Sequence, residues 1–525
     1  MTQAALPVPV APAKVVNKWA VAVAVSLGAL LEVIDMSIVN VALTQIQNSL
    51  GATLSQVSWV VSSYSIANVI ILPLSAWLGH RFGKKRYFVF SLVGFTLASA
   101  LCGMATTFPM LVIARVIQGL AGGGLLAKAQ AILFETFPRE EQAMAQGFFG
   151  AIVIAGPTIG PTLGGYLVTN VDWRWIFFIN LPIGVVAMLM NLAALPDDPE
   201  VRDRSTVDFF SILLLGIGLG SLQTVLEEGN SDDWFESRFI VTLTVAAAVG
   251  MIWFVYRQLV SKHPVVDLRI LRYRSLWAGS VLSVIVGIAL FGALFAVPLF
   301  AQTILGYTSQ QTGMLLLPGA LASAVAMPIA ARILQKVDPR IALVGGALIL
   351  VVAIYELSDL SPQTGEAQLF WPLVIRSFGQ VLMFLPLSLA TLGPIPKKDI
   401  AAASGFYSLT RQLGGSIGVA LLTTMLARRQ AFHRNVLIEH LGAIDPHVGD
   451  RIAMLQGSFA SKGFSIDDAH QKALFILDRN VSVQSLVLSF GDTFVATAVL
   501  IAVFLPLVAL LGRPNQGAAP APDAH

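Results

Sequence analysis

Long apolar runs, separated by short polar or charged segments, follow one another along almost the whole chain. Each run has about 20 residues or more, the length that a helix needs to cross the hydrocarbon core of a bilayer. The pattern predicts an all-α integral membrane protein with 14 transmembrane helices. The predicted spans are 18–42, 56–78, 86–106, 108–134, 143–168, 175–195, 208–226, 238–258, 275–302, 312–334, 341–357, 369–394, 401–426 and 487–512.

Composition supports this class. Hydrophobic residues make up 56% of the 525 residues and charged residues only 12%, whereas soluble domains have about 25% charged residues. A soluble fold of this size would need far more polar surface. The single cysteine, Cys102, lies within a span, so no disulfide framework is expected.

Basic residues are concentrated in every second loop. Because cytoplasmic loops carry an excess of Lys and Arg, both termini, with tails at 1–17 and 513–525, are expected in the cytoplasm. Arg428 and Arg429 contradict this locally, since they open the long segment 427–486 on the opposite side. If that segment were cytoplasmic, one late span would be miscounted. The basic clusters are Arg81, Lys84, Lys85 and Arg86, and Arg257, Lys262, Arg269, Arg272 and Arg274.

Three patterns occur in the same order in both halves of the chain, which indicates an internal repeat. They are a proline followed by two basic residues (Pro73, Arg81, Lys85; Pro328, Lys336, Arg340), "RVIQG" (115–119) with "RSFGQ" (376–380), and the glycine-rich fifth span with "RQLGGSIGVA" (411–420). A six-plus-six repeat around a midplane cavity is typical of transporters. The predicted units are a six-helix bundle at 18–200, two inserted helices at 201–262, and a six-helix bundle at 263–512.

The segment 427–486 is the only long stretch predicted outside the membrane. Its later part has helix-like apolar spacing and is expected to continue into the last span. Two interpretations are open: a helical cap over the outer mouth, or a docking surface for a partner.

Charged residues at membrane depth are costly and are therefore functional candidates. Glu32 and Asp35 lie three residues apart on one helical face of the first span. Burial and mutual repulsion favour their protonated forms, which suits a proton-coupled pump. The alternative is a carboxylate near the aqueous end that only bonds a neighbouring helix.

In the fourth span, Arg115, Gln118 and Gly122 form one stripe. A buried guanidinium keeps its charge and needs an acceptor, either a carboxylate that acts as a switch or a set of backbone carbonyls. Lys128 lies on a different face, where it either pairs with an acid or snorkels. Arg376 and Arg411 are expected to tie helices together in the second half.

The stretch "GPTIGPTLGG" (156–165) puts Gly156, Gly160 and Gly164 four residues apart, with Pro157 and Pro161 between them. Helices in lipid associate by close packing, so this row of glycines predicts a groove for a neighbouring backbone. In a pump such a seam would seal the substrate path against leak, whereas ordinary helix packing is the simpler interpretation. The stretch ends on Gly165.

Several of these motifs resemble the major facilitator superfamily, and in particular its fourteen-span drug:proton antiporters of the EmrB/QacA type. "GPTIGPTLGG" resembles the antiporter motif, and "LVIARVIQGLAGG" (111–123) resembles the span-four motif, with Arg115, Gln118 and Gly119 matching. "IDMSIVNVAL" (34–43) resembles the span-one motif, with Asp35 and Asn40 matching and Thr44 in place of its proline. "WRWIFFINLPIG" (173–184) fits the start of the sixth span.

The loop motif "AWLGHRFGKKRYF" (76–88) is also similar, with Arg81, Gly83 and Lys84 present. Ala76 replaces its first glycine and His80 its aspartate. The replacement of the aspartate puts the usual clamp contacts in doubt. A histidine can add pH sensitivity or can serve as a polar substitute.

The resemblance implies a twelve-helix core with two extra helices that works by alternating access. Proton influx drives export of lipophilic drugs, so the proton motive force takes the place of a cofactor. Asp35 and Arg115, with Glu32 as a further candidate, are linked to proton coupling. The resemblance also implies the bacterial inner membrane, and a periplasmic adaptor and outer-membrane channel as possible partners.

The pocket is expected to be wide and apolar, with Asn40, Tyr64 and Asn68 as candidate lining residues. The family resemblance does not separate drug export from export of one endogenous metabolite, fatty acid or siderophore, and uptake by symport is disfavoured by the antiporter motif. The sequence has no HExxH motif, no Cys/His metal cluster and no nucleophile with a convincing base, so neither an enzyme nor a metal site is expected.

Overall fold

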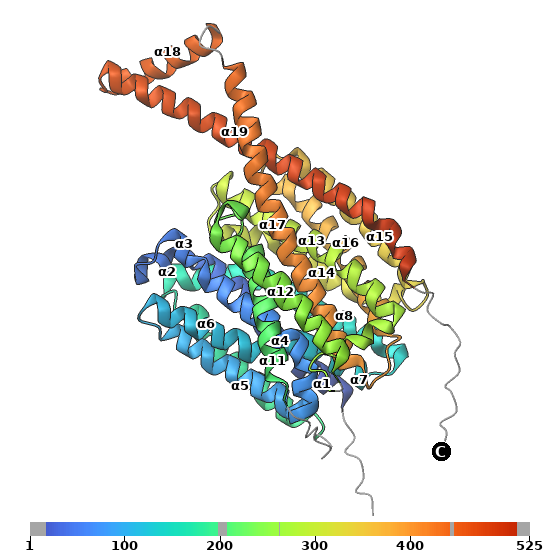
Figure 1. Ribbon diagram of the computed structural model, residues 1–525. Helices are drawn as coiled ribbons and strands as arrows, with labels where there is room; N and C mark the ends of the chain where they lie inside the picture. The colour runs from blue at the N-terminus through green and yellow to red at the C-terminus, as the bar shows by residue number, and fades with distance from the viewer. Residues whose placement is uncertain (1–16, 198–206, 262, 442–445, 512–525) are drawn as a thin grey trace, which may run out of the picture.

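A computed structural model describes residues 17–197, 207–261, 263–441 and 446–511. Every regular element in these ranges is a helix, so the all-α prediction is confirmed (Figure 1). The predicted terminal tails lie outside the described residues, apart from Asn17. The α-helices are α1 (Lys18–Ile38), α2 (Leu43–Leu50), α3 (Leu54–Val57), α4 (Trp59–Phe82), α5 (Lys84–Gly103), α6 (Phe108–Gly122), α7 (Leu125–Thr136), α8 (Arg139–Asn170), α9 (Trp175–Phe178), α10 (Asn180–Ala194), α11 (Phe209–Glu228), α12 (Arg238–Val260), α13 (Arg274–Thr303), α14 (Ser309–Ile333), α15 (Pro339–Glu356), α16 (Glu366–Leu392), α17 (Ile400–His440), α18 (Pro446–Ala460) and α19 (Ile466–Phe504). The short 3-10 helices are η1 (Val39–Val41), η2 (Trp234–Glu236), η3 (Leu268–Arg272), η4 (Leu357–Asp359) and η5 (Leu505–Leu510).

Twelve helical segments among the described residues are long and apolar enough to cross a membrane. The two other predicted spans correspond to α13 and α17. For α13 the described apolar part, Arg274–Ala289, is shorter than a full span. The membrane part of α17 carries Arg411, several glycines and several hydroxyl side chains, which lower its hydropathy. The count of fourteen stays a prediction.

The buried apolar residues form separate clusters rather than one core. One cluster contains side chains from the second half of the chain, from Ile270 to Leu511, together with Phe134. Two others contain only residues between Val21 and Leu195. A fourth joins α11 and α12 to α4 and α17, which lie in different halves. The inserted pair therefore packs against the seam between the two halves.

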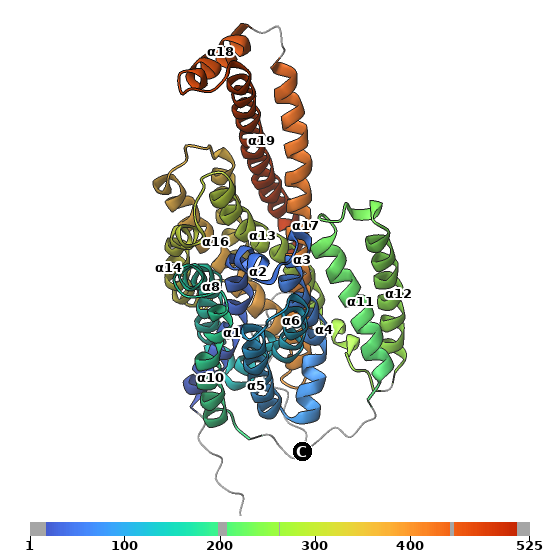
Figure 2. The ribbon, with the colours of Figure 1, turned by 90° about the vertical axis from the view of Figure 1, so that its left-hand side faces the viewer.

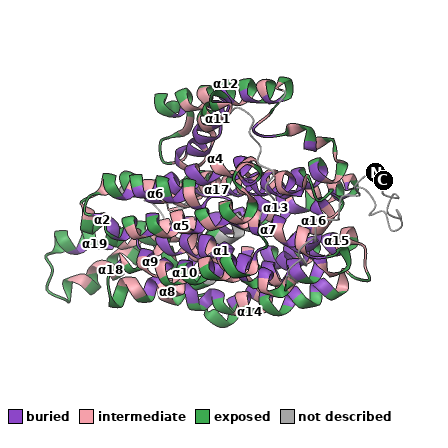
Figure 3. Ribbon diagram, turned by 90° about the horizontal axis from the view of Figure 1, so that it is seen from below, coloured by how far each residue is buried: buried purple, intermediate pink, exposed green. Residues whose placement is uncertain are grey.

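Helices α11 and α12 lie beside the main body, with exposed residues along the outer face of α12 (Figure 3). Asp208, the N-cap of α11, accepts two hydrogen bonds from Arg257 of α12, at 2.9 and 3.0 Å. The guanidinium lowers the pKa of Asp208 to about 2, so the contact is charged at neutral pH and ties the two inserted helices together.

A helical hairpin made of the end of α17, α18 and the start of α19 projects from one side of the body (Figures 1 and 2). We call this the hairpin side, and the opposite side, where α1 begins, the terminal side. As the sequence predicts, α19 runs unbroken from the hairpin into the last span. The hairpin stands away from the body, which does not fit a cap lying over the mouth. At its base Asp492 accepts hydrogen bonds from Arg429 at 2.5 Å and from His433 at 2.7 Å.

Two glycine positions shape the helices around the candidate site. The fourth predicted span is broken into α6 and α7 at Gly123 and Gly124. Gly124 has φ +77°, which favours glycine because it lacks a Cβ. Gly83, at φ +94°, separates α4 from α5 in the same way. The break in the fourth span exposes backbone donors at the start of α7.

Candidate functional site

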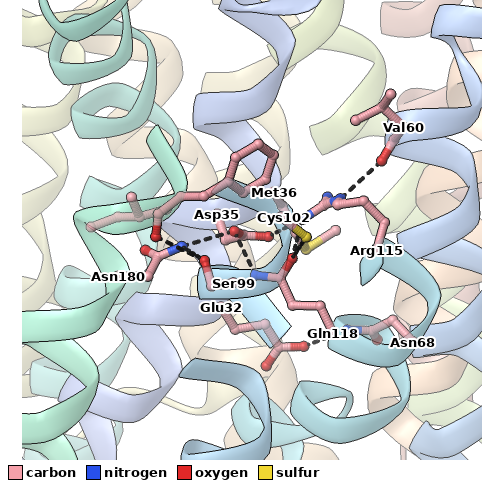
Figure 4. A network of polar contacts seen from close by, with 12 residues as sticks. Glu32, Asp35, Met36, Val60, Asn68, Ser99, Cys102, Arg115, Gln118 and Asn180 are labelled. Atoms are coloured by element: carbon pink, nitrogen blue, oxygen red, sulfur yellow. Dashed lines mark hydrogen bonds and ion pairs between the residues drawn. The ribbon is translucent and has the colours of Figure 1, made fainter. Parts of the chain in front are cut away.

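Asp35 is the centre of a buried polar network that joins three helices (Figure 4). One carboxylate oxygen accepts a hydrogen bond from Arg115 Nη1 of α6 at 2.6 Å. The other accepts from Gln118 Nε2 of α6 and from Asn180 Nδ2 of α10, both at 2.9 Å. Asp35 is 0% exposed and Arg115 1% exposed. Asp35 thus connects α1 to α6 and α10 through a fully buried ion pair.

Arg115 also forms hydrogen bonds and a ring contact on its other sides. Its Nε donates to the Val60 carbonyl oxygen at 2.9 Å, and its Nη1 also donates to Gln118 at 2.7 Å. The guanidinium carbon lies 4.2 Å from the centre of the Tyr64 ring, a cation–π contact. Sequence reasoning left open whether a carboxylate or a backbone carbonyl would be the acceptor, and the structure shows both.

Glu32 belongs to a second network. Its carboxylate accepts from Asn68 Nδ2 of α4 at 2.6 Å and from the Leu126 backbone N–H at 2.8 Å. Leu126 is in the first turn of α7, where the helix dipole favours a negative charge. The break at Gly123 and Gly124 creates this helix start. Although Glu32 and Asp35 are both buried on α1, they accept hydrogen bonds from different residues and therefore belong to separate networks.

The three candidate pocket residues lie in different surroundings. Tyr64 stacks on Arg115 and Asn68 holds Glu32, so both belong to the two networks. Asn40 of η1 is exposed and donates to the Met36 carbonyl oxygen at the end of α1. Asn40 therefore lies apart from the networks.

Gly119 brings α6 close to α4. A Cβ at this position would lie 2.5 Å from the Tyr64 carbonyl oxygen, so any larger residue would push the two helices apart. Two residues that sequence reasoning did not single out also shape the site: Asn180, and Ser99, which accepts from Asn180 at 3.0 Å. The signal for Asn180 was present, since it lies in "WRWIFFINLPIG".

The glycine row of α8 packs against α1, as the predicted seam requires. A Cβ at Gly156 would lie 2.6 Å from Val33, one at Gly164 2.6 Å from Val41, and one at Gly160 would collide with the Ser37 hydroxyl. Ser37 also donates to the Gly156 carbonyl oxygen at 3.2 Å. Pro157 and Pro161 lie inside α8 without ending it. The face of α1 opposite this seam carries the two acids.

Gly165 continues the row toward the second half of the chain. A Cβ there would lie 3.1 Å from the backbone nitrogen of Gln310 in α14. The antiporter-like stretch thus packs on α1 at three positions and on α14 at the fourth.

The loop between α4 and α5 forms charged contacts on the terminal side. Lys84 and Glu135 of α7 form an ion pair at 2.7 Å, and Lys397 from the second half donates to the Glu135 carbonyl oxygen at 2.9 Å. Arg81 lies over the Trp77 ring at 5.5 Å. His80, Lys84 and Glu135 line a small cavity of about 30 Å³. Lys84 therefore pairs within the first half with the residue that Lys397 contacts from the second half, although His80 replaces the usual aspartate.

The remaining basic residues within the predicted spans lie in different environments. Lys128 donates to Ser91 at 2.7 Å and lies 4.0 Å from the Tyr87 ring centre, and it forms no ion pair with an acid within the described residues. Arg376 of α16 is 4% exposed. Arg411 of α17 makes only ring contacts within the described residues, and the expected tie between helices is not formed by hydrogen bonds there.

The inserted helix α11 contributes a polar contact that sequence reasoning missed. Gln223 Nε2 donates to Ser65 of α4 at 3.1 Å and to Ser416 of α17 at 2.7 Å, which bridges the two halves. Glu228 accepts from Ser62 of α4 at 2.6 Å. The part of the chain that the structure describes contains no group of three or more metal-ligating side chains.

Comparison with known proteins identifies the family. The model of the Major Facilitator Superfamily matches residues 25–419. The chain belongs to the major facilitator superfamily. This facilitator is 33% identical over 497 residues to the multidrug export protein EmrB of Escherichia coli K12, covering 94% of this chain and 95% of the relative. It is 31% identical to the fatty acid resistance protein FarB of Neisseria gonorrhoeae, covering 94% and 96%.

Solved structures agree on the fold. The facilitator is similar to the human organic anion transporter MFSD10, with a TM-score of 0.57, 14% identity, and coverage of 92% of this chain and 99% of that one. It is also similar to the proton:xylose symporter XylE, with a TM-score of 0.56, 14% identity, and coverage of 94% and 99%. At this identity the likeness shows the fold alone, an all-helical arrangement of many spans.

Proposed function

We propose that this protein is a proton-driven multidrug exporter of the bacterial inner membrane. The observation that carries the proposal is the fully buried Asp35–Arg115 ion pair, which joins α1 to α6 and, through Asn180, to α10. The relatedness to EmrB multidrug export proteins supports the export of varied compounds.

The geometry supports a switch at Asp35. The Asp35 carboxylate accepts three hydrogen bonds, one of them from a guanidinium, and hydrogen bonds that involve a charged group are stronger than neutral ones. A proton on Asp35 cancels its attraction to Arg115 and leaves the guanidinium with Val60, Gln118 and the Tyr64 ring. Protonation therefore loosens α1 from α6 and α10 at one point in the membrane.

The effect of this loosening is directed by the packing of α1 on α8. The Gly156, Gly160 and Gly164 row keeps those two helices in backbone contact. Because interdigitated helices resist relative sliding, movement of α1 at Asp35 carries α8 with it. Helix α8 in turn packs on α14 of the second half, through Gly165 and Gln310. Proton binding can thus bias the two halves toward one access state.

We assign the terminal side to the cytoplasm, because the basic loops lie there, and the hairpin side to the periplasm. The contact of Lys84 and Lys397 with Glu135 then closes the cytoplasmic face. With this orientation, we propose the projecting hairpin as the contact for a periplasmic adaptor and an outer-membrane channel. Export of a single endogenous compound by the same mechanism remains the second candidate, and a panel of substrates distinguishes the two.

The test is gradient-driven transport in proteoliposomes. Wild-type protein should move a lipophilic cationic dye, rhodamine 6G, and a second unrelated dye when a pH gradient is imposed. Asp35→Asn should bind rhodamine 6G but lose gradient-driven transport, because it cannot exchange a proton. Asp232→Asn, which removes an exposed carboxylate on the hairpin side, is the matched control and should transport as wild type does.

Equal transport by Asp35→Asn and wild type would exclude Asp35 as the coupling site. Transport of only one compound from a broad panel would favour a dedicated exporter over a multidrug pump.

A further inference from the structure

Arg411 is a buried cation without a buried anion. It is 7% exposed, and within the described part of the chain its Nη1 has no hydrogen-bond partner. The guanidinium carbon lies 5.1 Å from the Phe384 ring centre and 5.7 Å from that of Tyr407. None of the described carboxylates forms an ion pair with it. A guanidinium remains charged under all ordinary conditions, so this position holds a permanent positive charge.

The ring contacts do not offset the cost of burying that charge. A cation–π contact contributes about 0.5–2 kcal/mol, whereas burial of an ion costs several kcal/mol even after relaxation. The nearest described carboxylate partners do not relieve this cost: no ion pair to Arg411 is formed within the described residues, and Glu32 of α1 accepts its hydrogen bonds from Asn68 and Leu126 instead.

Two further unpaired polar groups lie on the same face of α17. Ser404 and Ser408 precede Arg411 by seven and three residues, so all three side chains share one helical stripe. Ser404 is 0% and Ser408 3% exposed, and neither hydroxyl has a hydrogen-bond partner among the residues that the structure describes. A long helical side chain points back toward the N-terminus of its helix, which directs the guanidinium toward Ser408. The stripe presents hydrogen-bond donors without acceptors.

The position of the stripe is between the two halves of the transporter. Phe384 belongs to α16, and α17 itself packs against α4 and α7 of the first half, so Arg411 lies on a helix that contacts both halves. The surrounding rings of Phe384 and Tyr407 provide an apolar surface beside the charge. An amphipathic anion satisfies both features, since its head group pairs with Arg411 and its body packs on the rings.

We propose that Arg411, with the hydroxyls of Ser404 and Ser408, is a binding subsite for the carboxylate or similar anionic head group of an amphipathic substrate. The inference rests on the proposed export function and adds a substrate class to it. A planar carboxylate fits the guanidinium as a bidentate partner, and it supplies the acceptor oxygens that the two serine hydroxyls lack.

The experiment compares two probes of equal size that differ in charge, naphthalene-2-carboxylate and naphthalene-2-carboxamide. Binding to full-length protein in nanodiscs is measured by equilibrium dialysis, with empty nanodiscs to correct for partition into lipid. Wild-type protein should bind the carboxylate more tightly than the carboxamide. Arg411→Gln should weaken carboxylate binding about tenfold, as expected for loss of a charged hydrogen-bonded pair, and leave carboxamide binding unchanged.

Two more variants make the result specific. Arg411→Lys keeps the charge but loses the two parallel N–H donors of the guanidinium, so it should bind the carboxylate with intermediate affinity. Arg332→Gln removes an exposed arginine at the end of α14 and should bind both probes as wild type does. Each variant is first checked by gel filtration and by its apparent melting temperature.

The proposal is overturned if wild type shows no preference for the carboxylate, or if Arg411→Gln retains wild-type carboxylate affinity. Equal loss of both probes by a folded Arg411→Gln would assign the residue to packing instead. Because dialysis needs no gradient, failure here is separate from failure of proton-driven export.

Discussion

Arg115 and Arg411 are both buried at membrane depth, one in each half of the chain, yet their surroundings differ. Arg115 has a carboxylate at 2.6 Å, a backbone carbonyl, an amide oxygen and an aromatic ring around it. Arg411 has two aromatic rings and no hydrogen bond within the described residues. The same side chain is neutralised within the protein in one half and left unneutralised in the other.

The difference shows how one fold can assign proton coupling to one buried arginine and substrate recognition to the other. A charge that is paired inside the protein responds to whatever changes its partner, here a proton on Asp35. A charge that is unpaired responds to whatever brings an opposite charge from outside, here an anionic substrate. Substitutions that remove the anion beside Arg115, or that add one beside Arg411, should therefore have opposite kinds of effect.

The largest effect is expected from breaking the Arg115 pair. Asp35→Asn leaves Arg115 without its anion, which makes it resemble Arg411, and removal of one partner of a buried pair costs about 3–5 kcal/mol. Arg115→Gln should be similarly destabilising. The double variant should be more stable than either single one, because no uncompensated charge remains. The apparent melting temperatures of the four proteins in detergent measure this, and additive losses would contradict it.

A smaller loss of stability is expected when Asn180 is replaced. Asn180→Ala removes one hydrogen bond to the charged Asp35 carboxylate, which is worth about 1.5–3 kcal/mol. The control is Asn191→Ala in the same helix. Asn191 donates to the carbonyl oxygens of Ala24 and Ala187, which are neutral acceptors, so its loss should be nearer about 1 kcal/mol. An equal drop in melting temperature for both variants would show that Asp35 is not charged in this network.

The converse change gives Arg411 an internal anion. Ser408→Asp places a carboxylate three residues before Arg411 on the same face, so the pair can form within α17. Carboxylate binding by equilibrium dialysis should weaken about tenfold, because the added side chain competes with the ligand. Ser408→Asn has the same size without the charge and should weaken binding less. Tighter carboxylate binding by Ser408→Asp would contradict the proposed subsite.

The smallest effect on stability is expected at Arg411 itself. Because its charge has no partner to lose, Arg411→Gln should change the free energy of unfolding by less than about 1 kcal/mol, or should stabilise the protein. This contrasts with Arg115→Gln. The melting temperatures of the two variants, measured side by side without ligand, test the comparison directly. A drop at Arg411 as large as that at Arg115 would reveal a structural partner.

The sequence predicted the chemistry of this site better than its geometry. The sequence alone identified Asp35, Arg115 and Gln118 as candidates, because charged groups within an apolar run are costly and usually have a function. The sequence could not predict that Glu32 joins a different network, because this depends on the break of the fourth span at Gly123 and Gly124. The repeated glycines there gave a local signal for a break, but not for which carboxylate it would serve.

Other features depend on contacts between distant segments. Asn180 is 145 residues from Asp35, and its role needs α10 to lie beside α1. Arg411 was expected to tie helices because buried arginines generally have acceptors, and only the packed structure reveals that the acceptor is missing. The bridge from Gln223 to Ser65 and Ser416 could not be predicted, because nothing in the sequence sets where the inserted pair docks.

The central claim, that Asp35 exchanges a proton with the substrate cycle, is tested most directly by proton release. Rhodamine 6G is added to detergent-purified protein in weakly buffered solution, and the change in pH is followed with an indicator. Wild type and Asp232→Asn should release protons in proportion to the bound dye, and Asp35→Asn should bind dye without releasing any. Equal release by Asp35→Asn and wild type would contradict the account and move the coupling proton to another residue.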